Sequence, residues 1–103
     1  MKKIIVTQRI DYIKNYKETR DALDQKLSEW LIKIDLLPIP ISNKLFLFLD
    51  DNDMQISQQT NIQNWLSAIK PNALLLSGGN DIGEYPERDA IEYFLLDWAN
   101  KNN

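Results

Sequence analysis

The feature that most constrains this chain is a short apolar run, Leu74–Leu76, that ends in Ser77 and two glycines. The run shows no alternation of apolar and polar residues, which is typical of a strand covered on both faces within a parallel sheet. Glycine adopts backbone angles that are closed to other residues, and it lets a ligand approach its N–H group closely. Ligands of open α/β sheets bind at the carboxyl ends of the strands. We therefore expect the functional site around Gly78 and Gly79.

The composition predicts one globular domain. The chain has 103 residues, which is enough for a single domain with a modest core. Its formal charge is −3, with acidic and basic residues interspersed, and this argues against binding to nucleic-acid phosphates. No segment is apolar over the length of a membrane span, and the N-terminal residues lack a signal-sequence pattern. Together with the absence of cysteine, this favours a cytoplasmic protein without a membrane partner.

The residue types that are missing also limit the chemistry. The chain contains neither histidine nor cysteine, so Cys–His pairs, Ser–His pairs and histidine-based metal sites are excluded within these residues. The acidic run Asp50–Asp53 lacks the glycine and the glutamate that an EF-hand loop requires at Ile56 and Ile62, and we interpret it as a solvated turn. We expect no metal and no cofactor. Catalysis by this chain alone would depend on carboxylates, lysine, tyrosine or backbone groups.

Alternating strand and helix patterns predict an α/β fold. The expected strands are Ile4–Thr7, Leu36–Ile41 and Ala73–Ser77, with a loop over Asp11–Lys14 and helices over Tyr16–Asp35, Thr60–Lys70 and Glu87–Asn100. The first helix should bury Leu23, Leu27, Trp30, Leu31 and Ile34, the second Ile62, Trp65, Leu66 and Ile69, and the third Ala90, Ile91, Phe94, Leu95 and Trp98. Thr60 is the expected N-cap of the second helix. Tyr93 and Leu96 widen the apolar arc of the third helix, which predicts burial against more than one neighbour. The run Leu45–Leu49 fits either a short helix or an extra strand.

Right-handed crossovers give the three strands the order 2-1-3, the opening half of a three-layer, flavodoxin-like parallel sheet. Pro38 and Pro40 cannot donate to a strand ladder, so their strand belongs at an edge. The strand Ala73–Ser77 would form the other edge without the charge, bulge or proline that normally blocks one. We therefore interpret residues 1–103 as the first half of a single larger α/β domain. A second copy of the chain, giving a homodimer, is another expected occupant of this open edge.

Two groups of residues carry a family resemblance. Gly78 and Gly79 are followed by a helix that opens with Arg88 and Asp89 and has Glu92 three residues later. This pattern resembles the γ-glutamyl hydrolase branch of the class I glutamine-amidotransferase-like superfamily. The segments Val6–Arg9, Thr19–Gln25 and Leu37–Pro40 look more specifically like the bacterial γ-glutamyl-CDP-amidate hydrolases of capsule phosphoramidate synthesis. The resemblance spans nearly the whole chain except about residues 44–60.

The resemblance implies a hydrolase that cleaves a γ-glutamyl amide through a Cys–His–Glu triad. In that family a cysteine on a sharp strand-to-helix turn attacks the γ-glutamyl carbonyl, and a later His–Glu pair activates the cysteine. The nucleophile strand of the family follows the helix that ends here near Lys101. All three triad residues would then lie beyond Asn103, and this chain alone is predicted to be inactive. The intact enzyme would bind a small γ-glutamyl substrate.

The resemblance also suggests roles for residues within the chain. The backbone N–H of Gly79 would supply one donor of the oxyanion hole, with Gly78 shaping the turn. Asn80 and Asp81 would orient the glutamyl head group at the rim. Arg9, at the end of the first strand, would offer its guanidinium fork to a carboxylate or phosphate.

Alternatives remain open for both the residues and the whole chain. Arg88 either binds substrate or, together with Asp89 and Glu92, caps its helix and forms ion pairs. Instead of an amidohydrolase half-domain, the chain would be a non-catalytic, truncated α/β module that associates through its open strand edge.

Overall fold

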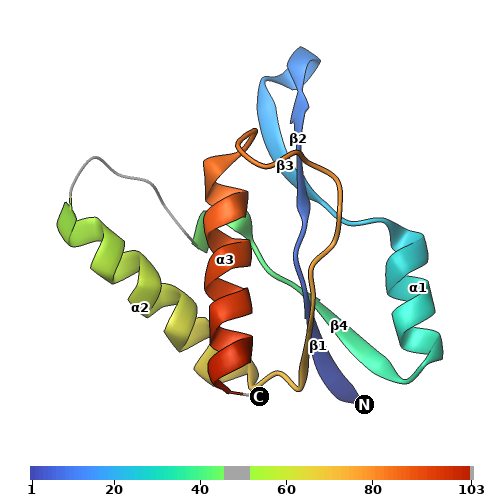
Figure 1. Ribbon diagram of the computed structural model, residues 1–103. Coiled ribbons are helices and arrows are strands. Elements are labelled where there is room, and N and C mark those ends of the chain that lie inside the picture. The colour runs from blue at the N-terminus through green and yellow to red at the C-terminus, as the bar shows by residue number, and fades with distance from the viewer. Residues whose placement is uncertain (46–51, 103) are drawn as a thin grey trace.

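The structure is a computed structural model that describes residues 1–45 and 52–102, and the side chains of residues 1–45 and 61–102. Figure 1 shows a central sheet with helices on either side and a hairpin that projects beyond the sheet. In chain order the elements are β1 (Lys2–Val6), β2 (Arg9–Ile13), the 3-10 turn η1 (Lys14–Tyr16), β3 (Glu18–Ala22), α1 (Gln25–Lys33), β4 (Leu36–Pro40), the 3-10 turn η2 (Asn43–Leu45), α2 (Asn52–Ile69), β5 (Ala73–Leu75) and α3 (Pro86–Lys101).

The main sheet has three parallel strands in the order β4-β1-β5. The fold is therefore α/β, and the strand order predicted from the sequence is confirmed. β1 takes the central place because Ile4, Ile5 and Val6 are β-branched and are buried on both faces of the sheet. Ile4 lies opposite Pro38 of β4 on one side and Ala73 of β5 on the other.

Side-chain alternation along β1 divides the core into two clusters, one on each face of the sheet. Ile4 and Val6 pack with Leu31 of α1. Ile5 points to the opposite face, where α2 and α3 cover it with Ile62, Leu66, Ile91 and Leu95. The domain thus has three layers, with α1 on one face of the sheet and α2 and α3 on the other (Figure 1).

The outer edge of β4 is blocked by proline. The Ile41 N–H donates to the carbonyl of Val6 at 3.1 Å. The backbone N–H and C=O groups of the odd-numbered residues in this segment therefore point toward β1. In a parallel ladder the backbone groups of the next residue on either side point away from the partner strand. Pro38 and Pro40 therefore occupy the outward positions, where other residues would present a free N–H.

The outer edge of β5 has no such protection. The Thr7 N–H donates to the carbonyl of Leu75 at 3.1 Å, so Leu75 faces β1. By the same alternation, the backbone groups of Leu74 and Leu76 point away from β1. Within the described ranges, β1 is the single strand neighbour of β5.

The hairpin of β2 and β3 was not predicted. The two strands pair in antiparallel register, Arg9 opposite Ala22 and Ile13 opposite Glu18, so the expected loop over Asp11–Lys14 and the expected helix start at Tyr16 are both wrong. β3 shows four exposed residues in succession. A strand without a buried face has no apolar alternation, and its sequence is indistinguishable from the polar face of a helix.

α1 begins at Gln25 because Asp24 caps it: the Asp24 Oδ1 accepts a hydrogen bond from the Lys26 N–H at 2.9 Å. Leu31 is fully buried, as predicted. Trp30 and Ile34 are 55% and 49% exposed, so their predicted burial is wrong. Within the described residues the sheet is three strands wide, and the row of side chains around Leu31 suffices for α1 to cover its face.

α2 is longer than predicted. It begins at Asn52, so Thr60 lies inside the helix and the predicted N-cap there is wrong. Ile62 and Leu66 are buried as predicted. Of the ambiguous run Leu45–Leu49, Leu45 ends the 3-10 turn η2, and residues 46–49 lie outside the described residues, as do Asp50 and Asp51.

α3 agrees with its prediction to within one residue at each end, and Pro86 occupies its first turn. Ile91 and Leu95 are fully buried. Tyr93 and Leu96, which we expected to be buried, are 64% and 47% exposed. They lie on the side of α3 where the sheet ends at β5, so nothing in the described part of the chain covers them.

Candidate functional site

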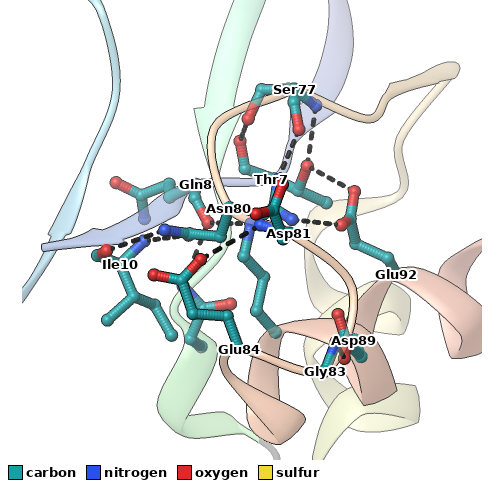
Figure 2. A network of polar contacts seen from close by, with 12 residues as sticks. Thr7, Gln8, Ile10, Ser77, Asn80, Asp81, Gly83, Glu84, Asp89 and Glu92 are labelled. Atoms are coloured by element: carbon teal, nitrogen blue, oxygen red, sulfur yellow. Dashed lines mark hydrogen bonds and ion pairs between the residues drawn. The ribbon is translucent and has the colours of Figure 1, made fainter.

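The candidate site lies at the carboxyl ends of β1 and β5. Beyond the last backbone hydrogen bond between the two strands, side-chain hydrogen bonds join them. The Ser77 N–H donates to the Thr7 Oγ1 at 2.8 Å, and the Ser77 hydroxyl donates to the Thr7 carbonyl. Thr7 is completely buried. These bonds fix the position from which the segment Gly78–Gly79 leaves the sheet (Figure 2).

Arg88 connects both strand ends to α3. It is 4% exposed, and its Nε donates to the carbonyl of Gln8 at 3.0 Å, while its Nη2 donates to the carbonyl of Ser77. Its Nη1 lies 2.7 Å from the Glu92 Oε1, one turn further along the helix. The other carboxylate oxygen of Glu92 accepts from the Thr7 hydroxyl at 3.3 Å. All three guanidinium nitrogens of Arg88 are therefore used within the protein, which favours its interpretation as an ion-paired brace.

Gly79 is required by its position. Its φ is +141°, a conformation that residues with a side chain rarely adopt. A Cβ at Gly79 would lie 2.7 Å from the Cβ of Arg9, which is too close for two carbon atoms. Gly78 has no such constraint, because a Cβ there would meet nothing within 4 Å. The second glycine of the pair thus allows the turn to pass directly over Arg9.

Arg9 and Gly78 of the glycine turn line the same cavity. The cavity has a volume of about 440 Å³ and is lined by Arg9, Leu75, Ser77 and Gly78 on the sheet side and by Ala22, Leu23, Asp24 and Leu27 on the hairpin and α1 side. The Arg9 side chain is half exposed, with its Nε 2.8 Å from the Asp11 Oδ1. Its guanidinium is thus held by one exposed ion pair at the cavity rim.

Asn80 and Asp81, which were both predicted to orient the substrate, have different surroundings in the structure. The Asn80 Oδ1 accepts from the Ile10 N–H at 2.7 Å, and the Asn80 Nδ2 donates to the Ile10 carbonyl at 3.1 Å. Its side chain therefore fastens the loop after the glycine turn to β2, as a neighbouring strand would (Figure 2). Asp81 is exposed, and its N–H donates to the Glu84 carboxylate at 3.2 Å. Asp81 is thus exposed in the loop, whereas the side-chain amide of Asn80 is occupied by backbone groups.

Replacing Asn80 with alanine should release the hairpin from this loop. The Ile10 N–H and carbonyl lose both partners, which we expect to lower the free energy of unfolding by about 1–3 kcal/mol. Amide hydrogen exchange measured by NMR should show faster exchange at Ile10 than in the parent chain. Asn64→Ala on the exposed surface of α2 is the control. Unchanged exchange at Ile10 would contradict the bracing role.

One residue of the site, Asn43, was missed by the sequence reasoning. It is 2% exposed, and its Nδ2 donates to the Asp21 Oδ1 at 2.8 Å and to the Gln8 carbonyl at 3.2 Å. The Asn43 N–H also reaches the second oxygen of Asp21, at 3.2 Å. Asn43 thus joins β3 to the end of β1. A lone asparagine after a proline-rich strand carries no spacing pattern, so the sequence offered no signal for it.

The arrangement is suited to binding an oxygen atom or an anion. Gly78 and Arg9 line the cavity, and Gly79 packs against the Arg9 side chain. Hydrogen bonds of Thr7, Ser77 and Arg88 hold the two strand ends together. The Thr7 and Ser77 hydroxyls are committed to bonds within the protein. The chain has no cysteine or histidine that would act as a nucleophile or its base.

In the part of the chain that the structure describes, none of the helices combines the length and the apolar character needed to cross a bilayer. Comparisons of the chain with protein-family models, with curated proteins and with solved structures found no match.

Proposed function

We propose that this chain is the N-terminal portion of a glutamine amidotransferase-like hydrolase that cleaves a γ-glutamyl amide, with γ-glutamyl-CDP-amidate as the candidate substrate. In this proposal it supplies the oxyanion strand, β5 with Gly78 and Gly79. The observation that carries it is the position of Gly79, which has a φ of +141°, at the carboxyl end of an edge strand and directly against Arg9. A backbone turn that only glycine can adopt leaves its N–H groups accessible to a ligand.

The chemistry follows from charge development during amide cleavage. When a nucleophile attacks a γ-glutamyl carbonyl, the carbonyl oxygen becomes an oxyanion. A preorganised N–H donor stabilises that oxyanion, and loss of one such donor typically costs about 10²–10³ in rate. Gly79 would supply one donor, and Arg9 would bind the α-carboxylate or the phosphate of the substrate through its guanidinium fork. Asp81 at the rim would contact the glutamyl amino group.

The open edge of β5 supports the same proposal. In a flavodoxin-like sheet of order 2-1-3-4-5, the neighbour of the third strand is the fourth. A fourth strand beside β5 would end next to Gly79, so a nucleophile at its carboxyl end would face the oxyanion donor. The Cys–His–Glu triad of the proposed enzyme would therefore lie on segments that follow α3.

The reading frame that follows codon 103 tests the proposal. We expect it to continue into a Gly-x-Cys-x-Gly turn, and the extended protein to release glutamate from a γ-glutamyl amide, with loss of activity when that cysteine is replaced by serine. A stop codon directly after residue 103, or an extended protein without glutamate release, would count against the hydrolase.

The chain of 103 residues should release no glutamate from γ-glutamyl amides, because it has no cysteine and no histidine. A coupled glutamate dehydrogenase assay on the purified chain measures this directly, with a known γ-glutamyl hydrolase as the positive control. Turnover that co-purifies with the chain and is lost in the Gly79→Ala variant would show that its own residues catalyse the reaction.

A second candidate function is a non-catalytic α/β module that associates through the β5 edge. The exposure of Leu76, Tyr93 and Leu96 beside that edge favours it. This candidate needs no residue outside the chain.

A further inference from the structure

The cavity beside the glycine turn is lined by two residues of opposite charge. Arg9 lies on its sheet side and Asp24 on the side of α1, and the cavity has a volume of about 440 Å³. Pockets for small molecules typically measure roughly 300–1,000 Å³, so the volume of this cavity fits a metabolite. A ligand held there meets a cation and an anion at once.

Arg9 and Asp24 do not neutralise each other. In the part of the chain that the structure describes, Arg9 forms its ion pair with Asp11 through Nε, and its Nη1 and Nη2 have no partner. The Asp24 Oδ1 accepts from the Lys26 N–H at 2.9 Å, and its Oδ2 has no partner among these same residues. Arg9 therefore keeps two nitrogen donors, and Asp24 one acceptor oxygen, for a bound group. A ligand with a carboxylate and an ammonium group would use both.

The other residues that line the cavity add an apolar wall with a polar end. Leu23 and Leu27 line it near α1 and Leu75 lines it on β5, and all three are only partly buried. Such side chains offer contact to the methylene groups of a ligand, whereas the backbone at Gly78 offers hydrogen-bonding groups. The combination suits a zwitterion with a short aliphatic chain that ends in a carboxamide.

We propose that this cavity binds an α-amino-acid group, with Arg9 on its carboxylate and Asp24 on its ammonium group. A free amino acid and the glutamyl end of a larger molecule both carry these two charges. The choice of a glutamyl chain rests on the proposed function, whereas the zwitterion site rests on the cavity alone. Asp24 is then a specificity-determining residue, because its carboxylate is left unpaired by a ligand without the ammonium group. Asp81, the other candidate for the ammonium contact, is not among the described residues that line the cavity.

Titration of the purified 103-residue chain with L-glutamine, followed by NMR, tests the proposal. We expect the amide resonances of Arg9, Leu27 and Gly78 to shift. Glutaramate, which is glutamine without its ammonium group, should bind about tenfold more weakly, and so should γ-aminobutyramide, which lacks the carboxylate. L-γ-Glutamylanilide distinguishes the two sources of the group. Equal or tighter binding than glutamine indicates the glutamyl end of a larger molecule, and weaker binding indicates a free amino acid.

Asp24→Asn removes the charge and keeps the helix cap, because asparagine caps a helix about as well as aspartate. In this variant glutamine and glutaramate should bind with nearly equal affinity, since the ammonium group has lost its partner. Asp35→Asn, the same change beyond the other end of α1, is the control and should keep the tenfold preference. Retention of the preference in Asp24→Asn, or its loss in Asp81→Asn instead, would overturn the role of Asp24.

Arg9→Gln removes the guanidinium and keeps the Cβ that lies against Gly79. Glutamine should then bind no more tightly than γ-aminobutyramide. Arg20→Gln is the matched control, because the side chains of Arg9 and Arg20 are 50% and 51% exposed and each pairs with an acidic residue two positions away. It should leave both affinities unchanged. A preference for glutamine that survives Arg9→Gln would contradict the carboxylate contact.

Failure of this site and failure of the proposed hydrolase give different results. Selective glutamine binding, without glutamate release by the extended protein, would support the site and count against the hydrolase. Glutamate release by an extended protein whose KM is unchanged by Asp24→Asn would do the reverse. A chain whose amide resonances at the cavity do not shift at the solubility limit of glutamine would overturn the proposal.

Discussion

Replacing Arg88 with methionine is expected to lower the free energy of unfolding by about 3–5 kcal/mol, which is the usual cost of breaking a buried ion pair by removing one partner. The substitution removes the Arg88 donor from the Glu92 Oε1 and from the carbonyls of Gln8 and Ser77, and it leaves the Glu92 charge without its cation. Urea denaturation followed by circular dichroism measures the loss. Because Arg88 joins the ends of β1 and β5 to α3, the variant should also show faster amide exchange at Ser77.

Arg20→Met is the matched control for this experiment. Arg20 forms an ion pair with Glu18 at 2.7 Å, the same separation as in the Arg88–Glu92 pair. The side chains of Arg20 and Glu18 are, however, both about half exposed. Exposed pairs contribute about 0–1 kcal/mol, so this variant should remain close to the parent chain. The double variant Arg88→Met with Glu92→Leu should be less destabilised than the sum of the two single changes, because no unpaired charge remains. Equal effects of Arg88→Met and Arg20→Met would show that burial adds nothing to the Arg88 contacts.

Gly79→Ala should destabilise the chain by about 1–3 kcal/mol, the typical cost of holding a residue with a side chain in a sparsely populated backbone region. The new Cβ must also move away from Arg9, whose Cβ would otherwise lie 2.7 Å from it. The turn and β2 then separate, and the change should be visible as shifted amide resonances of Arg9 and Ile10 in an NMR spectrum.

Gly78→Ala separates this effect from the general properties of glycine. The neighbouring position has open space around it, and it is not among the glycines with positive φ. Its substitution should change the free energy of unfolding by less than about 1 kcal/mol, and it should stabilise the chain slightly if the unfolded state loses freedom. Two variants of equal stability would mean that the turn relaxes freely and that Gly79 is not held against Arg9.

The sheet was predictable because its signals are local. Ile4–Val6 are β-branched, Pro38 and Pro40 can occupy only an edge, and the helix after Pro86 begins where proline favours a start. Each of these signals depends on one segment and on a steric rule. The three-strand order then follows from alternation and crossover handedness.

The β2–β3 hairpin, and the extent to which apolar helix residues are buried, could not be predicted from local signals. β3 consists mostly of exposed residues, and its place depends on Asp21 reaching Asn43, a residue 22 positions away. Trp30 has the correct helical spacing for burial, but the narrow sheet leaves no surface for it to cover. Periodicity reports which face of a helix is apolar, and it cannot report how much of that face finds a neighbour.

The candidate site shows the same division. Arg9 and Gly79 were both expected at the site, because each lies at the carboxyl end of a strand. The Arg88–Glu92 ion pair was one of the two interpretations that the sequence left open. The other partners of Arg88, and both partners of Asn80, are backbone carbonyls and N–H groups at Gln8, Ile10 and Ser77, which nearly every residue possesses. No sequence pattern distinguishes one such partner from another, so these contacts emerge only once the chain is folded.

The two prolines at the border of β4 have a consequence for the size of any assembly built by strand addition. A molecule with two accepting borders can add neighbours indefinitely and grow into a fibre. In this sheet the outward positions of β4 are Pro38 and Pro40, which have no N–H to donate. Strand addition at that border is therefore blocked, and a row of sheets joined edge to edge could not continue through it.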